Sequence, residues 1–241
     1  MPKLLAGLAL ALVFTAGGCK SEKVVGPTGV NRVLFIGNSY LFTQNIPEAV
    51  ESLAKSQGLE MTAEMVAGPD MALYDHLERG DAVNAMILGG WSHIVLQQGP
   101  SSVSYNRDSL RAVAVIYDGI AKQVNAKTAW FSAWPQQQHF STFPRAIESY
   151  RLAAEDVGGL YMPVAAAWLK AWELDPSLQL YSDGLHPSAE GAYLAAIVVY
   201  SALFQRTPVG LPPDADRLHL DIATATLLQS AAAQVMGYAP Q

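Results

Sequence analysis

The sequence has a single cysteine, Cys19, so it cannot form an intramolecular disulfide. Charged residues make up only 15% of the 241 residues, and Asp and Glu (21) outnumber Lys and Arg (15), for a net charge of -6. There is no Lys/Arg cluster, no Gly-rich phosphate loop and no Cys/His spacing typical of a metal site. These absences argue against nucleic acid as a partner, and we predict neither a metal nor a cofactor.

An apolar run opens the chain, where Lys3 is followed by Leu, Ala, Val and Gly over most of Leu4 to Phe14. A charged start and a short apolar core are typical of a secretory signal, and the run is too short for a comfortable membrane span. Three small residues then precede Cys19. This order resembles a bacterial lipoprotein signal, in which small residues stand directly before a cysteine that becomes the lipidated first residue.

The chain therefore divides into three predicted parts. Residues 1–19 are a lipoprotein-type signal segment with Cys19 as the anchor, residues 20–31 are a flexible tether, and residues 32–241 are one domain. Hydrophobic residues make up 51% of the sequence, which is ample for a single large core. We expect a protein of the bacterial cell envelope that meets the membrane through its lipid only.

Apolar runs of strand length alternate with longer segments of helical periodicity. Parallel strands need crossovers of this length, so the pattern predicts a three-layer α/β/α domain with a mostly parallel central sheet. The predicted strands cover 32–36, 61–67, 92–96, 128–134 and 160–165, and the predicted helices cover 46–59, 71–88, 109–124, 143–157, 166–173, 188–204 and 215–236.

Ser39 stands where a nucleophile is plausible. It lies in Gly37-Asn38-Ser39, directly after the first predicted strand, and a predicted helix follows. Open α/β sheets bind their ligands at the carboxyl ends of their strands. A Gly-x-Ser tripeptide is common by chance, so the hypothesis that Ser39 is a nucleophile needs the support of a second motif.

That second motif is Asp183-Gly184-Leu185-His186-Pro187, near the end of the chain. A serine hydroxyl becomes a good nucleophile when a histidine takes its proton, and a carboxylate orients that histidine. Aspartate and histidine three residues apart on a tight turn can meet locally. The alternative is purely structural, with Asp-Gly as a turn and Ser188 as the cap of the next helix.

Together the two motifs resemble those of the SGNH hydrolases, also called GDSL esterases and lipases. In that family the nucleophile lies in a Gly-Asp-Ser or Gly-Asn-Ser turn after the first strand, and an Asp-x-x-His near the C-terminus completes the triad. The resemblance covers about Arg32 to Phe204. It implies a flavodoxin-like SGNH fold and makes Ser39, Asp183 and His186 the triad candidates.

The resemblance also implies an oxyanion hole, with one departure. The backbone N–H groups of Ser39 and Gly68 match two of the family's donors. The third donor, an Asn in a Gly-x-Asn-Asp turn after the third strand, is missing, because that strand leads into Gln97-Gln98-Gly99-Pro100-Ser101. We expect Gln98 to replace it, with Gln97 and Ser101 as alternatives.

Three other histidines, His219, His139 and His76, are weaker candidates than His186. Asp216 and His219 repeat the Asp-x-x-His spacing, but they fall in a predicted helix, where residues three apart form a surface ion pair. His139 is expected in a loop at the edge of the site, and His76 is expected to be exposed or to cap a helix.

The expected function is a serine ester hydrolase with an acyl-enzyme on Ser39, His186 as base and then acid, and Asp183 as its orienting group. Glutamines after the third and fourth strands favour a small acyl group on a carbohydrate. The alternatives are a lipase or thioesterase of the same family, or a catalytically weak SGNH-like domain that binds an envelope glycan.

Overall fold

The computed structural model describes residues 29–238, so the predicted signal segment, Cys19 and most of the predicted tether lie outside the described residues. Five strands form one sheet in the order β2-β1-β3-β4-β5, and every neighbouring pair is parallel. The strands are β1 (Arg32–Gly37), β2 (Thr62–Ala67), β3 (His93–Leu96), β4 (Lys127–Phe131) and β5 (Leu160–Met162).

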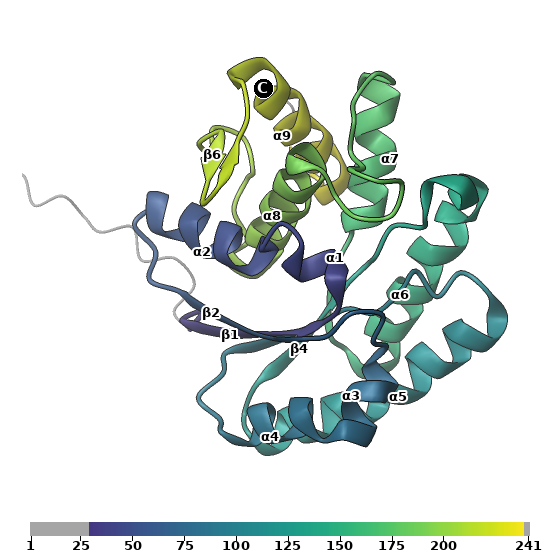
Figure 1. The fold of residues 1–241 in the computed structure, drawn as a ribbon. Helices are drawn as coiled ribbons and strands as arrows, with labels where there is room; N and C mark the ends of the chain where they lie inside the picture. Colours follow the sequence, from purple (N-terminus) through teal and green to yellow (C-terminus); the bar gives the residue numbers. More distant parts are fainter. Residues whose placement is uncertain (1–28, 239–241) are drawn as a thin grey trace, which may run out of the picture.

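Helices cover both faces of this sheet (Figure 1). One face carries α2 (Ile46–Ser56), α7 (Val164–Leu174), α8 (Ala189–Phe204) and α9 (Ile222–Met236), and the other carries α3 (Leu73–Arg79), α4 (Asp81–Ile87), α5 (Ser104–Gln123) and α6 (Phe143–Val157). Two short helices, α1 (Ser39–Phe42) and the 3₁₀ helix η1 (Gln137–Thr142), follow β1 and β4. The predicted three-layer α/β/α architecture is confirmed.

Beyond their first residues, β1 and β3 are apolar because both of their faces are buried. Along β1, Val33 and Phe35 pack into the core cluster beneath α2 and α8, whereas Leu34 and Ile36 pack into the cluster beneath α3 to α5. Helix α8 is buried over almost its whole circumference, because α2, α7, α9 and the sheet all pack against it.

The strand order fixes where a ligand can bind. From β1 the chain crosses to β2 at one edge and then returns to β3 on the other side of β1. Connections that leave two neighbouring strands in opposite directions open a crevice at the strands' carboxyl ends. The residues after β1 and after β3 therefore face one another across this crevice.

One predicted helix is in fact two. The periodicity of 71–88 predicts a continuous helix, but Gly80 adopts a left-handed conformation (φ 74°) and ends α3. Its N–H donates to the carbonyls of His76 and Leu77, and α4 begins at Asp81. Glycine reaches this conformation without the steric cost of a side chain, which explains the break.

The predicted C-terminal helix is also wrong in its first part. Residues 215–221 contain most of a small antiparallel hairpin of β6 (Asp214–Ala215) and β7 (Leu218–His219), turned at Asp216 with φ 56°. Helix α9 begins only after Asp221, whose side chain accepts a hydrogen bond from the Thr224 N–H as an N-cap.

The remaining differences are shifts of element ends. α5 begins at 104 rather than 109, β4 ends at 131 rather than 134, and β5 ends at 162, so that α7 starts at 164.

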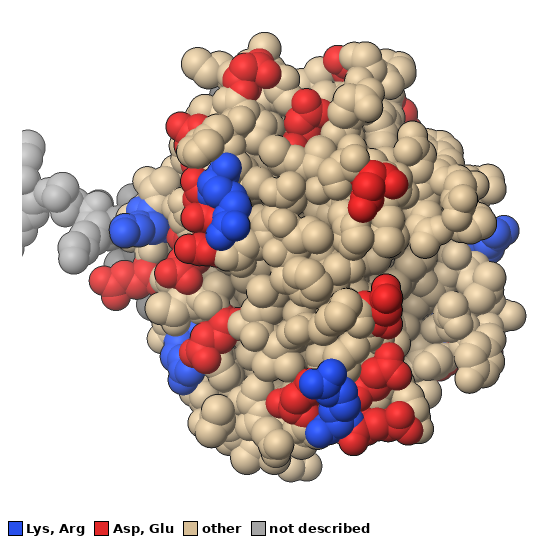
Figure 2. Space-filling view, in the orientation of Figure 1, with Lys and Arg blue, Asp and Glu red and all other residues tan. Residues whose placement is uncertain are grey.

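On the face in Figure 2, Lys and Arg are few and most lie beside Asp or Glu. Over residues 29–238, no helix combines the length and apolar character needed to cross a bilayer.

Candidate active site

Ser39 sits on a tightly held turn between β1 and α1. Asn38 is the N-cap of α1, and its side-chain oxygen accepts a hydrogen bond from the Tyr40 N–H. A side chain at Gly37 would clash, because a Cβ there would lie 2.3 Å from Gln97 Oε1. This close approach explains the glycine, and the N-cap turns the chain so that Ser39 leads the helix.

Three side chains form one hydrogen-bonded chain across 147 residues of sequence. His186 Nε2 lies 2.9 Å from Ser39 Oγ, and His186 Nδ1 lies 2.7 Å from Asp183 Oδ2. Because Nδ1 donates to a carboxylate, Nε2 of the neutral ring is left as an acceptor for the hydroxyl proton. The predicted triad residues are therefore together, in an arrangement that can remove a proton from Ser39.

The loop that carries Asp183 and His186 is fixed by its own backbone. Asp183 Oδ1 accepts hydrogen bonds from the N–H groups of Leu185 (2.9 Å) and His186 (2.7 Å). Gly184 has φ 84°, which only glycine adopts easily. The buried Trp134 indole donates to the Leu185 carbonyl at 3.0 Å and ties the loop to the end of β4.

Charge at the site is set by the same contacts. The hydrogen bond from His186, with those from the two backbone N–H groups, lowers the pKa of the Asp183 carboxyl to about 2. Tyr40 lies nearby, and its burial, together with the negative charge of Asp183, raises the pKa of its hydroxyl. Asp183 is thus ionised and Tyr40 neutral at ordinary pH.

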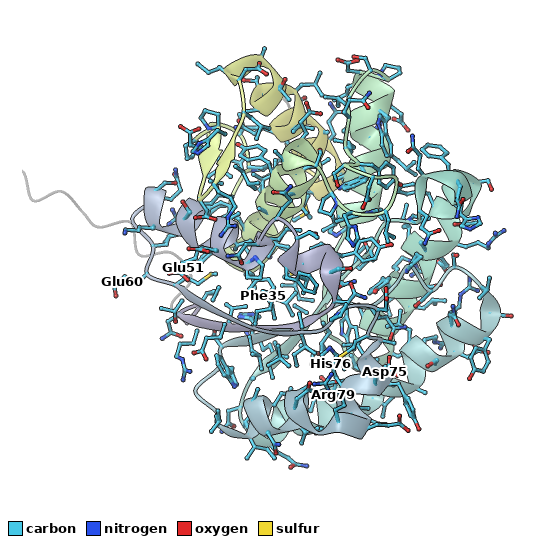
Figure 3. The ribbon with its side chains drawn as sticks, in the orientation of Figure 1. Phe35, Glu51, Glu60, Asp75, His76 and Arg79 are labelled. Atoms are coloured by element: carbon cyan, nitrogen blue, oxygen red, sulfur yellow. The ribbon has the colours of Figure 1, made fainter. Side chains whose placement is uncertain are left out.

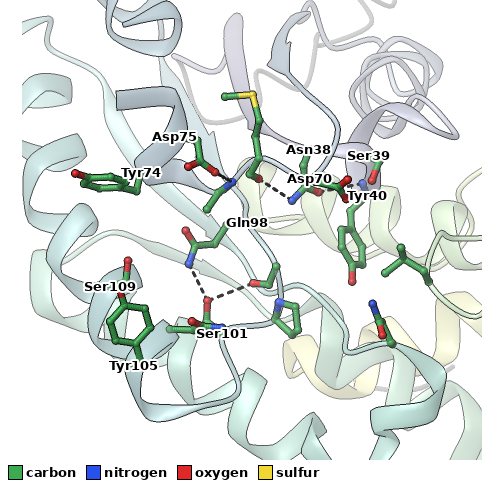
Figure 4. Close-up of a pocket in the computed structure, with 17 residues that line it drawn as sticks. Asn38, Ser39, Tyr40, Asp70, Tyr74, Asp75, Gln98, Ser101, Tyr105 and Ser109 are labelled. Carbon is green, nitrogen blue, oxygen red and sulfur yellow. Dashed lines mark hydrogen bonds between the residues drawn. The ribbon is translucent and has the colours of Figure 1, made fainter. Parts of the chain in front are cut away.

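The structure places the predicted oxyanion residues as follows. Gly68 N–H donates to the Gly37 carbonyl at 3.2 Å. Gln97 is fully buried, where its amide bonds both the N–H and the side chain of Asn38. Gln98 accepts from the Leu73 N–H and donates to Ser101 Oγ (Figure 4). Their oxyanion roles stay predictions.

A cavity of about 720 Å³ opens beside Ser39 (Figure 4). Gln98 and Ser101 line it from the end of β3, whereas Asp70 and Asp75 line it from the segment after β2. Tyr74 and Tyr105 also line it and are 51% and 81% exposed. Its described lining is more polar than apolar and contains no Lys or Arg.

A second cavity of about 550 Å³ lies on the other side of the Asp183 loop. Phe140, Trp172 and Tyr181 supply its aromatic wall, and Asp183 and Gly184 its rim. Phe140 is 48% exposed, whereas Trp134 is buried in a stack on Trp168 with ring centroids 3.9 Å apart. Trp134 therefore belongs to the core.

The competing histidines have other partners. His219 lies on β7 and pairs with Asp214 (3.2 Å) across the hairpin rather than with Asp216, and both partners are exposed. His139 lies on the exposed η1, with no buried neighbour in that element. His76 was expected to be exposed or capping, which is wrong, because its side chain is 1% exposed.

Sequence reasoning missed that Asn38, Gln97 and His76 hold the turn. An Asn immediately before a helix is a recognisable N-cap signal. The other two act through partners at least 39 residues away, so no local pattern announces them.

No protein-family model matches this chain, and no curated protein matches its sequence. Solved structures do match. A DUF4886 family protein from Bacteroides uniformis superposes with a TM-score of 0.75 at 18% identity, over 88% of this chain and 96% of that one. A proposed SGNH hydrolase from Slackia heliotrinireducens has a TM-score of 0.60 at 23% identity, over 72% of this chain and 99% of that one.

A mutant of an acetyl-xylooligosaccharide esterase from Geobacillus has a TM-score of 0.52 at 14% identity, over 75% of this chain and 94% of that one. Identities this low speak for the fold rather than for the substrate. The five-stranded parallel sheet, its strand order and these matches agree. This chain has the fold of the SGNH hydrolases.

Proposed function

We propose that the protein is a serine ester hydrolase. The observation that carries this proposal is the continuous chain of hydrogen bonds from Asp183 through His186 to Ser39 Oγ. The fold is one in which ester hydrolases are found. A complete proton-transfer path favours hydrolysis over a domain that only binds a glycan.

The reaction takes place in two steps. His186 Nε2 accepts the hydroxyl proton as Ser39 Oγ attacks the ester carbonyl carbon, and the alcohol then leaves with that proton. Water next attacks the acyl group on Ser39 and gives a proton to His186. The carboxylic acid leaves as Ser39 Oγ regains its proton, while ionised Asp183 stabilises the imidazolium in both steps.

The oxyanion of each tetrahedral intermediate needs hydrogen-bond donors. Ser39 N–H is the first amide of α1, so it has no acceptor within the helix. The Gln98 amide lines the same cavity. Its N–H group, which donates to Ser101 Oγ here, can break that hydrogen bond and donate to the oxyanion instead. We assign the side-chain donor to Gln98 on this basis, since Gln97 is buried against Asn38.

The substrate we propose is a small acyl ester on an uncharged carbohydrate. Carboxylates and amides beside Ser39 can bond sugar hydroxyls, and the exposed rings of Tyr74 and Tyr105 offer faces for the apolar side of a sugar. Asp70 and Asp75 would repel a phosphate-bearing thioester or phospholipid headgroup. A structural neighbour that acts on acetylated xylo-oligosaccharides is consistent with this class.

A chain-length and charge series tests the activity and its substrate. The purified full-length protein is assayed with p-nitrophenyl acetate, butyrate and octanoate, with an acetylated xylo-oligosaccharide and with an acyl-coenzyme A, and Ser39→Ala is the control. We expect acetate and the acetylated sugar to be the best substrates. A preference for octanoate or for the thioester would instead support the lipase or thioesterase alternative.

We also propose that Cys19 carries the lipid and that the mature protein is held in the cell envelope. The support is the sequence order of Lys3, the apolar run and the small residues before Cys19. Cys19→Ser should move the protein out of the membrane fraction and leave hydrolysis by the domain unchanged. Wild-type protein that stays unprocessed in the cytoplasm would contradict the proposal.

A further inference from the structure

His76 contacts the nucleophile turn from α3, which packs on the other face of the sheet from α8, the helix that follows His186. It lies on α3, buried between this helix and the sheet (Figure 3). Its Nε2 is 2.8 Å from the carbonyl oxygen of Gly37, and its Nδ1 is 3.0 Å from Asp81 Oδ1. Nothing in the reaction described above uses this second histidine–carboxylate pair.

The partners of His76 determine where its protons are. A carbonyl oxygen can only accept, so the contact with Gly37 requires a proton on Nε2. Burial opposes the charge on Asp81, but the hydrogen bonds from His76 and the Ala82 N–H, with the nearby Arg79, outweigh it and lower the pKa of this carboxyl. The contact of Nδ1 with Asp81 holds the ring from its other side.

The Gly37 carbonyl belongs to the peptide group that leads into Asn38 and then Ser39. That carbonyl accepts from His76 Nε2 and from Gly68 N–H, and the N–H of the same peptide group donates to Gln97 Oε1 at 3.0 Å. The peptide plane is therefore held on both edges. Rotation of this plane would redirect the Ser39 N–H and Oγ, which the reaction needs in fixed directions.

We propose that His76 is a positioning residue for the nucleophile, and that its Nε2–H fixes the orientation of the Gly37–Asn38 peptide group. This rests on the proposed function, because it assigns Ser39 as the nucleophile. A purely structural role would require only that the nitrogens of the buried ring have hydrogen-bond partners. The positioning role instead predicts a specific loss in the chemical step.

Two substitutions separate these roles. His76→Phe keeps a ring of similar size but removes the donor, whereas His76→Gln can place its amide N–H near the position of Nε2. The matched control is His93→Phe, since His93 is also buried but begins β3, at the end of that strand away from Ser39. Near-UV circular dichroism checks that each full-length variant is folded.

With p-nitrophenyl acetate we expect His76→Phe to lower kcat by about 10- to 100-fold with KM changed by less than about 2-fold, a loss typical of a slightly misplaced nucleophile. His76→Gln should recover part of the loss, and His93→Phe should keep the wild-type kcat. A fluorophosphonate that labels Ser39 should react more slowly with His76→Phe by a similar factor. A folded His76→Phe with unchanged kcat and labelling would overturn the proposal.

Two NMR measurements decide the inference independently of any activity. In the wild-type protein, imidazole ¹⁵N resonances should show a proton on His76 Nε2 at neutral pH, and a bare Nε2 would overturn the proposal even if no variant folds. The Asn38 amide should exchange faster in His76→Phe than in His93→Phe. If the wild-type protein neither hydrolyses esters nor labels at Ser39, the proposed function fails, and these measurements still test the hold on Gly37.

Discussion

Two histidines touch the Gly37–Ser39 turn, and their surroundings differ. The His186 side chain is 23% exposed and its Nε2 faces a hydroxyl, which can donate or accept. The His76 side chain is 1% exposed and its Nε2 faces a carbonyl, which can only accept. His186 faces a hydroxyl that can give up a proton, so its ring can act as a base. His76 faces a carbonyl that has no proton to give, so its ring can serve only as a donor there.

The two pairs also differ in how they are built. Asp183 and His186 share one loop whose backbone N–H groups bind the carboxylate, so this pair forms locally and only Ser39 must be brought to it. His76 and Asp81 lie on different helices and meet because the turn at Gly80 ends α3 before α4 begins. The Asp183–His186 pair lies at the surface, whereas His76 is buried between α3 and the sheet.

The largest effect should come from removing either end of the proton-transfer path. Ser39→Ala and His186→Ala should each lower kcat by about 10⁴-fold or more, with little further loss in the double variant, because the two groups act as a unit. The matched control is His219→Ala, which removes an exposed histidine that also pairs with an aspartate. Wild-type turnover in Ser39→Ala would contradict the mechanism.

The sequence predicted that Ser39, Asp183 and His186 would lie together, and their side chains are within hydrogen-bonding distance. This much was predictable because the strand-turn-helix pattern at Ser39 and the short loop at Asp183 are both local signals. The strands were predictable for the same reason, since most are short apolar runs and the second, Thr62–Ala67, alternates loosely. The catalytic roles of the three residues stay predictions.

The role of His76 could not be predicted, for two physical reasons. A continuous helix over 71–88 would set His76 and Asp81, five residues apart, on different faces, and only the turn at Gly80 brings them together. Its second partner, Gly37, comes from β1 through tertiary packing. In the same way, a hairpin replaced the predicted helix around His219 and gave it Asp214 in place of Asp216.

The next largest effect should follow from Asp183→Asn. The Asn oxygen can keep the two backbone hydrogen bonds of Oδ1, but its amide would then donate towards His186 Nδ1. This forces the ring proton onto Nε2, where it blocks acceptance from Ser39, and comparable changes cost up to about 10⁴-fold in kcat. We expect a loss of about 10²- to 10⁴-fold in kcat, with the fold retained. Asp214→Asn is the control, and equal activities of the two variants would show that Asp183 does not select the tautomer.

The oxyanion donor should matter less. Losing one side-chain donor typically costs about 10²- to 10³-fold in kcat with little change in KM, and this is what we expect for Gln98→Ala. Gln97→Ala should instead lower the melting temperature, since Gln97 is buried against Asn38. A Gln98→Ala variant with the wild-type kcat would move the role to Ser101 or leave the oxyanion to backbone donors.

The smallest effect concerns stability and the other buried histidine, His93, which sharpens the contrast with His76. His93 is buried, its Nδ1 has no hydrogen-bond partner among the described residues, and burial, with the nearby charge of Lys127, lowers the pKa of its ring to about 4. The folded protein thus holds His93 neutral, whereas the unfolded chain takes up a proton below about pH 6.5.

Because the unfolded state binds more protons in that interval, the free energy of unfolding should fall as the pH drops from about 6.5 towards 4, by on the order of 3 kcal/mol. Denaturant unfolding at a series of pH values measures this slope, and His93→Phe should flatten it because no proton can then bind there. An equal slope in wild type and His93→Phe would mean that His93 finds an acceptor when it is protonated, and that burial alone does not separate the two histidines.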